Sequence, residues 1–195
     1  MNFLAHLYLS GNSKALRLGN FIADSVKGGA WHHYPAPIKR GILLHRAIDD
    51  FTDSHPTVSK SKEIFREKYR HYAGVIVDIV YDHYLAKNWS DYSAIPLSTY
   101  AQSIYQEMEE QLDFMPEKAQ YMLPFMIRHN WLEAYAQLAG IQQVLRGMAN
   151  RTRFDSHMDE ATQELKANYQ SLQSDFEAFF PQLQEHVRLW LEQNP

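Results

Sequence analysis

The chain has 195 residues, a formal net charge of −4, 45% hydrophobic residues and no cysteine. This length predicts one domain with a hydrophobic core, and the missing cysteines exclude a disulfide framework, thiol catalysis and Cys-ligated zinc or iron–sulfur sites. No apolar run approaches the roughly 20 residues that a membrane helix needs, and the first residues lack the basic region of a signal peptide, so we expect a cytoplasmic protein.

The hydrophobic spacing is helical almost throughout, which predicts an all-α fold. The first four helices are expected over residues 2–9, 13–27, 38–52 and 58–69. Residues 31–37 are expected to be a non-helical loop, because prolines favour extended conformations in the residues before them. The apolar segment 75–89 is predicted as a buried helix, since a lone strand would have no partner.

The second half of the chain continues the helical pattern. Helices are expected over residues 97–112, 117–128 and 140–148, followed by a C-terminal pair over 156–180 and 182–193. Pro181 is expected to interrupt this pair, and Pro124 is expected to kink its helix or mark a boundary. No linker or repeat divides the chain, so we predict a single compact helical domain over 1–195, with a helical pair at 157–195 packed on its core.

Histidine and aspartate interrupt the apolar faces of several predicted helices. Two pairs have i, i+4 spacing, which places both members of a pair on one side of a helix. A buried carboxylate is costly unless it is paired or bound to a metal. These residues are therefore either hydrogen-bonded core groups or candidate ligands of a divalent ion, and the candidates are His6, Asp24, His45, Asp49, Asp78 and Asp82.

The chemistry of this set narrows the choice of ion. Carboxylates favour Mg²⁺ or Mn²⁺, while imidazole admits Mn²⁺, Fe²⁺ or Zn²⁺. Such an ion would activate water and neutralise phosphoryl oxygens, as phosphoester hydrolysis requires. His83 lies about 100° around the helix from Asp82, so it is expected to act beside the ion, as a proton donor or a supporting group.

The charge is unevenly distributed along the chain. Residues 1–72 contain 11 Lys/Arg and 6 Asp/Glu, which gives +5 and leaves 8 basic and 17 acidic residues, or −9, for residues 73–195. The basic part either addresses an anionic partner or is simply a solvated face.

Four blocks in order along the chain resemble the acyl carrier protein phosphodiesterase family. They are MNFLAHL at 1–7, GNFIADSVKG at 19–28, GILLHRAID at 41–49 with Thr52 and Asp53, and DIVYDHYL at 78–85, with a weaker GMANR at 147–151. This family is regarded as an unusual branch of the HD-type metal-dependent phosphohydrolases. The resemblance implies a distorted HD-domain fold and a divalent ion, most often Mn²⁺, with Mg²⁺ or Fe²⁺ as alternatives. The ordinary HD signature has an adjacent His-Asp pair, and in this chain the order of the pair is reversed, as Asp82-His83.

The resemblance also implies a reaction. The protein would hydrolyse the phosphodiester that links 4′-phosphopantetheine to the serine of holo-acyl carrier protein, giving the apo-carrier. His83 would protonate the leaving serine, and Arg46 or Lys27 would hold the phosphoryl oxygens. Replacing Asp78 with Ala is expected to abolish metal-dependent turnover and to leave melting largely unchanged.

Acyl carrier proteins are small and acidic, which gives the basic part of the chain a role in steering the substrate. The candidate partner-binding residues are Lys14, Arg17, Lys39, Arg40, Lys60, Lys62, Arg66 and Arg70. No nucleic-acid or membrane partner is expected, and the oligomeric state is left open. Two alternatives stay open: an HD-type phosphohydrolase acting on nucleotides or another small phosphoester, and a non-catalytic helical protein that binds partners through its basic face.

Overall fold

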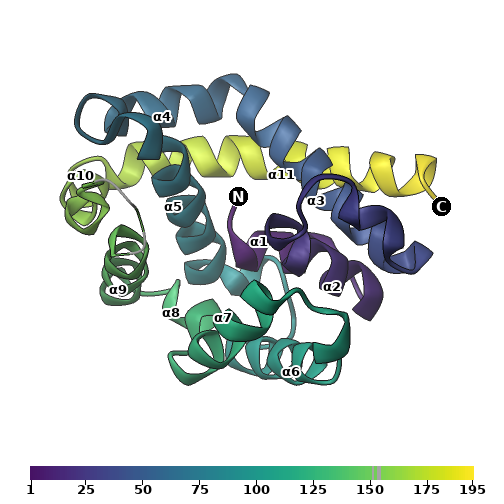
Figure 1. Cartoon of the computed structure of the whole chain (residues 1–195). Helices are drawn as coiled ribbons and strands as arrows, with labels where there is room; N and C mark the ends of the chain where they lie inside the picture. The colour runs from purple at the N-terminus through teal and green to yellow at the C-terminus, as the bar shows by residue number, and fades with distance from the viewer. Residues whose placement is uncertain (151, 153–154) are drawn as a thin grey trace.

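The computed structural model describes residues 1–150, 152 and 155–195, and every regular element within them is a helix. This confirms the all-α prediction (Figure 1). The α-helices are α1 (Phe3–Leu9), α2 (Lys14–Ile22), α3 (Ala36–Ser54), α4 (Pro56–Tyr69), α5 (Ala73–Lys87), α6 (Leu97–Glu109), α7 (Glu117–Arg128), α8 (Trp131–Ala134), α9 (Leu138–Ala149), α10 (Thr162–Ala167) and α11 (Tyr169–Gln193). Short 3₁₀ helices join several of them, at Ala23–Ser25, Gly28–His33, Arg70–Tyr72, Trp89–Asp91, Leu112–Phe114 and Met158–Glu160.

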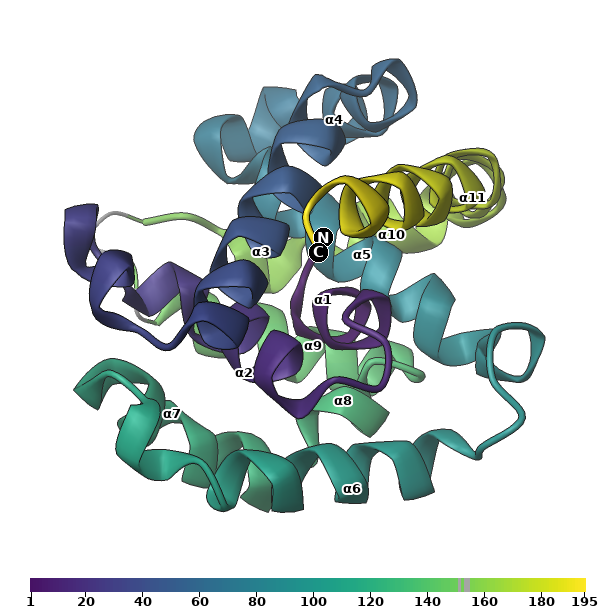
Figure 2. The same cartoon turned by 90° about the vertical axis from the view of Figure 1, so that its right-hand side faces the viewer.

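Helix α5 lies at the centre of the molecule, with α4 and α11 on one side and α6 and α7 on the other (Figures 1 and 2). It packs against α1, α4, α9 and α11, and all its side chains over residues 79–86 are buried. The prediction of a buried helix here is confirmed. Apolar residues from α1 to α11 share one core cluster, while the HD-like detail of the fold stays a prediction.

Helices α2 and α3 cross with their backbones in contact. A Cβ atom on Gly19 would lie 2.1 Å from the carbonyl oxygen of Ile38, and one on Gly41 would lie 2.4 Å from that of Leu16. Only glycine permits so close an approach, because any side chain would force the helices apart. The crossing brings Asn20, which directly follows Gly19, beside His45, which lies one turn after Gly41.

The break predicted at Pro181 is wrong, because α11 runs through this residue from Tyr169 to Gln193. A proline inside a helix costs about 3 kcal/mol. Here the same helix buries Phe176, Phe179 and Phe180, and each buried Phe side chain contributes about 1.5–3 kcal/mol. Tertiary burial therefore outweighs the local preference. The long helix begins only after Asn168, and the preceding segment forms the separate α10.

The predicted loop over residues 31–37 is also partly wrong. Gly28–His33 forms a 3₁₀ helix, and α3 begins at Ala36 with Pro37 in its first turn. Proline is tolerated there, because the N–H groups of the first turn have no hydrogen-bond acceptor within the helix, so the N–H that proline lacks is not needed. The second predicted helix ends at Ile22 rather than at residue 27. Helix α7 continues through Pro124, so this residue marks no boundary.

Arg151, the last residue of the weak block at 147–151, lies outside the described residues. Of the helices that are described, none combines the length and the hydrophobicity needed to cross a bilayer.

Candidate metal site

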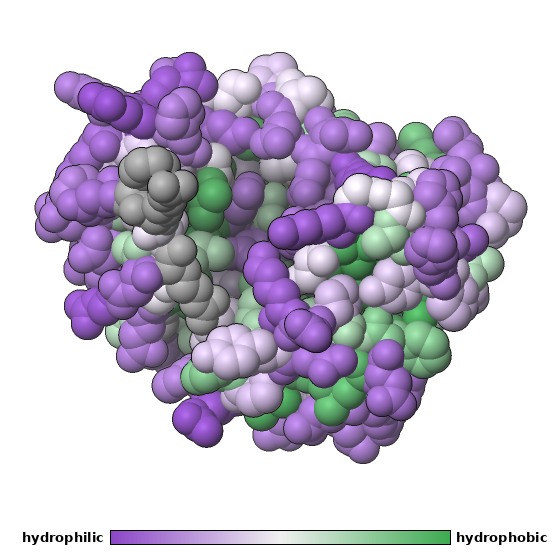
Figure 3. All heavy atoms as spheres, viewed as in Figure 1, coloured by the Kyte–Doolittle hydropathy of each residue, from purple (hydrophilic) through white to green (hydrophobic). Residues whose placement is uncertain are grey.

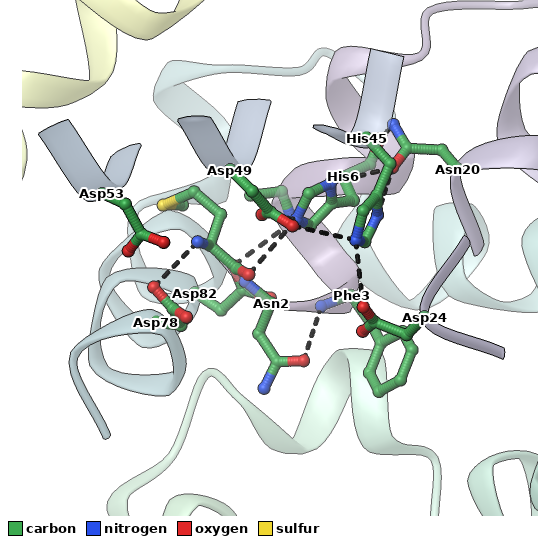
Figure 4. Close-up of polar contacts among 12 residues, drawn as sticks. Asn2, Phe3, His6, Asn20, Asp24, His45, Asp49, Asp53, Asp78 and Asp82 are labelled. Atoms are coloured by element: carbon green, nitrogen blue, oxygen red, sulfur yellow. Dashed lines mark hydrogen bonds and ion pairs between the residues drawn. The ribbon is translucent and has the colours of Figure 1, made fainter. Parts of the chain in front are cut away.

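A polar cavity of 180 Å³ lies where α1, α2, α3 and α5 meet (Figure 4). Five of the six residues predicted as metal ligands line it, and only Asp82 does not. Its lining comprises Met1, Asn2, Phe3, His6, Asn20, Phe21, Asp24, His45, Asp49, Thr52, Asp53 and Asp78. The structure therefore brings five of the six candidates together from four separate segments, and their role as metal ligands stays a prediction.

The two histidines of the cavity share one amide partner. The rings of His6 and His45 stack with their centroids 4.1 Å apart, and their Nδ1 atoms lie 2.8 and 3.0 Å from Oδ1 of Asn20. The amide orientation is fixed by its other end, because Nδ2 of Asn20 donates to the carbonyl of His6 and to Oγ of Ser10. An amide oxygen only accepts, so both Nδ1 atoms carry the proton.

This tautomer leaves both Nε2 atoms facing the carboxylates. Nε2 of His45 lies 3.0 Å from Asp49 and 3.3 Å from Asp24, and Nε2 of His6 lies 3.2 Å from Asp49. One ligand atom each from His6, His45 and Asp49 lie within 4.8 Å of one another. In the neutral state each Nε2 presents a lone pair, as a metal ligand must.

The electrostatics of the site follow from burial and from these contacts. Burial, together with the neighbouring His45, lowers the pKa of His6 to about 4. Burial also opposes charge on His45, but its hydrogen bonds to Asp24 and Asp49 outweigh this and raise its pKa to about 9. Burial disfavours ionised Asp49, yet the two imidazoles hold the pKa of this carboxyl well below its usual range. The cavity thus concentrates negative charge around two imidazoles.

These residues fit a divalent metal ion. Two imidazole nitrogens and a carboxylate oxygen converge, the imidazole protons are held on the opposite nitrogens by Asn20, and Asp24 offers a further oxygen beside His45. Imidazole and carboxylate donors together suit Mn²⁺, Fe²⁺ or Zn²⁺. Hydrogen bonds to the outer nitrogen atoms of ligating histidines are a regular feature of metal sites.

The other predicted pair, on α5, has different contacts. Asp82 is fully buried, and its carboxylate accepts hydrogen bonds from the backbone N–H groups of Asn2, Leu4 and Ala5 at 2.7–3.3 Å. It therefore caps the start of α1 across the interior. Burial raises its pKa to about 7, although the Met1 ammonium and these N–H groups favour the carboxylate. Asp78 accepts a 2.8 Å bond from the Met1 ammonium.

The predicted catalytic residues His83, Arg46 and Lys27 do not line the polar cavity. His83 is buried. Its Nδ1 atom lies 2.7 Å from the carbonyl oxygen of Tyr135, and its Nε2 atom lies 2.7 Å from the hydroxyl of Tyr169. The guanidinium of Arg46 lies over the Trp31 ring, 5.4 Å from its centroid. Lys27 is exposed, just after the 3₁₀ turn that carries Asp24.

The structure separates the predicted partner-binding residues into two groups. Lys62, Arg66 and Arg70, with His71, line a cleft of 760 Å³ that shares Asp53 and Asp78 with the polar cavity; we call it the basic cleft.

The other partner-binding candidates lie outside the basic cleft. Arg17 is buried and paired with Glu107, Lys14 pairs with Glu110 and Lys60 pairs with Asp175. Arg40 donates to the carbonyl of Leu191, and Lys39 is half-buried on α3.

Sequence reasoning missed Asn20 and Thr52. Asn20 is 1% exposed between apolar neighbours, a signal similar to the one that pointed to His6, but its amide was not among the residue types considered. Thr52 follows Asp49 on α3, and its buried hydroxyl has no hydrogen-bond partner among the described residues. Both line the polar cavity.

Comparisons with known proteins show the family to which this chain belongs. A family model described as acyl carrier protein phosphodiesterase matches residues 1–183. The chain belongs to the acyl carrier protein phosphodiesterase family. Relatives named acyl carrier protein phosphodiesterase include one from Photorhabdus laumondii, 38% identical over 95% of this chain and 94% of that protein. Another, from an Enterobacter species, is 34% identical over 94% of this chain and 95% of that protein. None of the solved structures matches the chain.

Membership of the acyl carrier protein phosphodiesterase family bears on the two alternatives that the sequence leaves open, a phosphohydrolase acting on nucleotides or another small phosphoester and a non-catalytic binding protein. The family model matches residues 1–183, which include the four segments that build the polar cavity. Nothing in the comparisons supports the nucleotide alternative.

Proposed function

We propose that this member of the acyl carrier protein phosphodiesterase family hydrolyses the phosphodiester between 4′-phosphopantetheine and the serine of holo-acyl carrier protein. The observation that carries the proposal is the convergence of His6, His45 and Asp49 in a cavity that adjoins the basic cleft, in a chain whose relatives bear this name. A cytoplasmic location stays a prediction from the sequence.

The proposed metal ligands are Nε2 of His6, Nε2 of His45 and a carboxylate oxygen of Asp49, with Asp24 as a further ligand. Mn²⁺ is the proposed ion, because the resemblance to the family implies it and the mixed imidazole and carboxylate donors suit it, as they also suit Fe²⁺. When bound, such an ion supplies Lewis-acid polarisation of phosphoryl oxygens and activation of water. Asn20 would hold both imidazoles in the tautomer and orientation that coordination needs.

The contacts of the remaining predicted residues lead to different proposed roles. Both oxygens of Asp82 are engaged by the backbone of α1, which supports a structural rather than a ligating role. Both ring nitrogens of His83 have partners away from the polar cavity, so its role as a proton donor stays a prediction. Arg46 and Lys27 likewise stay candidates for holding phosphoryl oxygens.

The direct test uses holo-acyl carrier protein as substrate. The protein is incubated with the carrier and Mn²⁺, with and without a chelator, and the carrier is weighed by mass spectrometry. Loss of the phosphopantetheine mass only without chelator is expected, and repeating the reaction with Mg²⁺ and Fe²⁺ ranks the ions. A carrier of unchanged mass under every condition would overturn the proposal.

The basic cleft is the proposed docking surface for the acidic carrier. Lys62, Arg66 and Arg70 lie beside the polar cavity, so a carrier held there would present its modified serine close to the metal ligands. Charge complementarity of this kind mainly raises the association rate and makes it sensitive to salt.

The docking surface is tested by charge reversal. Arg66→Glu with Arg70→Glu is expected to lower kcat/KM for the carrier about tenfold and to flatten its salt dependence. Hydrolysis of a small phosphodiester should not change. Lys14→Glu is the matched control, because Lys14 lies outside the basic cleft, in a pair with Glu110. Equal losses in both variants would place the docking surface elsewhere.

A further inference from the structure

A second cavity, largely apolar and of 780 Å³, opens beside the metal site. We call it the apolar cavity; it lies between α7, α8 and α9 on one side and the start of α1 on the other. Met122, Phe125, Trp131, Tyr135 and Val144 contribute to its walls. Figure 3 shows the face of the molecule seen in Figure 1, hollowed near its middle, with hydrophobic residues inside the hollow.

The apolar cavity is continuous with the metal site. Phe3, Phe21 and Asp24 line both the apolar cavity and the polar cavity. Val75 lines both the apolar cavity and the basic cleft. The metal ligands therefore stand at a junction, with a basic surface on one side and an apolar one on the other.

Tyr135 forms part of the wall of the apolar cavity. Its side chain is fully buried, and its hydroxyl makes no hydrogen bond within the described part of the chain. Because this hydroxyl has no accessible surface, Tyr135 shapes the wall and does not present a polar group to an occupant. Tyr135 is held in place through its backbone, because its carbonyl oxygen pairs with His83.

The substrate of the proposed function has the matching chemistry. A phosphodiester has two sides, and here one side is the carrier serine and the other is the pantetheine arm. The arm is uncharged, with a branched hydrocarbon near the phosphate and two amides beyond it. An apolar cavity of a few hundred cubic ångströms, with few polar groups, is the usual kind of site for such a molecule.

We infer that the apolar cavity receives the pantetheine arm, while the carrier stays over the basic cleft. This inference rests on the proposed function, because it takes the arm from the proposed substrate. It assigns the two sides of the scissile bond to two surfaces: the serine leaves toward the basic cleft and 4′-phosphopantetheine stays in the apolar cavity until it dissociates.

Gly147 offers a way to fill the apolar cavity. It lines the cavity from α9, and a Cβ atom built on it would meet no atom within 4 Å. Gly147→Leu should therefore project a side chain into the space of the arm without disturbing the helix. Gly29→Leu is the matched control, since a Cβ there meets only a His32 side-chain atom at 3.8 Å and the residue lies outside the apolar cavity.

Kinetics with two substrates separate the arm from the reacting group. Gly147→Leu is expected to lower kcat/KM for holo-acyl carrier protein about tenfold or more and to leave hydrolysis of bis(4-nitrophenyl) phosphate unchanged, because that ester has no arm. Equal effects of Gly147→Leu on both substrates, or no effect on the carrier, would overturn the inference.

Calorimetry of the binding of free 4′-phosphopantetheine tests the role of the apolar cavity without turnover. The wild-type chain and Gly29→Leu should bind it, and Gly147→Leu should bind it about tenfold more weakly. If the wild type binds it in this way but hydrolyses neither substrate, the proposed function fails and the apolar cavity stands. A wild type that does not bind, or a Gly147→Leu variant that binds equally well, overturns the inference whether or not the carrier is hydrolysed.

Discussion

Helices α3 and α5 each carry a pair of ionisable residues at i, i+4 spacing, His45 and Asp49 on α3 and Asp78 and Asp82 on α5, yet the two pairs have different surroundings. His45 and Asp49 on α3 converge with His6 on an open polar cavity. On α5, Asp82 is covered by the first turn of α1 and Asp78 is paired with the Met1 ammonium. Spacing fixes the face of a helix on which two side chains lie, but the neighbouring element decides whether that face binds a ligand or supports the fold.

The difference between α3 and α5 arises from what packs against each helix. Gly19 and Gly41 let α2 approach α3 closely, which sets Asn20 beside His45 and leaves the Nε2 side open. The face of α5 meets the beginning of α1 instead, where a helix has unpaired N–H groups that need an acceptor. A carboxylate can bind a metal ion or accept hydrogen bonds at the start of a helix, so its chemistry alone does not distinguish the two roles.

The largest effect is expected at Asp49. Asp49→Asn should reduce metal-dependent hydrolysis of holo-acyl carrier protein roughly a thousandfold, as loss of a preorganised charged group in an enzyme site does. Mass spectrometry of the carrier measures the rate. Asp50→Asn is the control, because Asp50 is the exposed neighbour on the same helix. Near-normal turnover in Asp49→Asn would remove α3 from the catalytic site.

Asp82 should behave as a residue of the fold. Asp82→Ala leaves three backbone N–H groups, two of them buried, without their acceptor and should lower the free energy of unfolding by about 3 kcal/mol. Urea unfolding measures this loss. At a temperature where the variant is folded, its affinity for Mn²⁺ should match that of the wild type. A variant of normal stability that has lost its metal would reverse the roles assigned to α3 and α5.

Asn20 tests whether the tautomer of the histidines matters. Asn20→Ala should weaken Mn²⁺ binding about 10–100-fold, the usual range for groups that orient metal ligands. Isothermal titration with Mn²⁺ gives the affinity. Ser10→Ala removes the other side-chain partner of the Asn20 amide but leaves its carbonyl oxygen in place, so its affinity should change little. The same loss in both variants would point to general loosening of α2.

The smallest effect is expected at Asp78, which lines the polar cavity but is paired with the Met1 ammonium. Asp78→Asn should reduce turnover of the carrier no more than about tenfold, or about 1.4 kcal/mol in activation free energy. This is far less than the loss of turnover that the sequence alone suggests. Kinetics on Asp78→Asn and Asp49→Asn side by side rank the two helices, and equal losses would make Asp78 a ligand.

The sequence predicts much of the fold and part of the site, for identifiable reasons. Some features depend only on residues close together in the sequence and can therefore be predicted from it. These are the buried helix over residues 75–89 and the polar interruptions at His6, Asp24 and His45. The continuity of α11 through Pro181 depends on the phenylalanines packed beneath it. Likewise, nothing near Asn20 in the sequence indicates that two histidines from other helices will share its amide.

The link between Asp82 and the first turn of α1 has a consequence for synthesis of the chain. His6, Asp24, His45 and Asp49 all leave the ribosome early, but the carboxylate that caps α1 lies 78 residues beyond Leu4. At 5–20 residues per second it follows by roughly 4–16 seconds. Asp49, the last proposed ligand, precedes Asp82 by 33 residues, so for roughly 2–7 seconds the nascent chain holds every proposed metal ligand and cannot yet fix α1. A fragment that ends before α5 should therefore neither hold the ion nor fold.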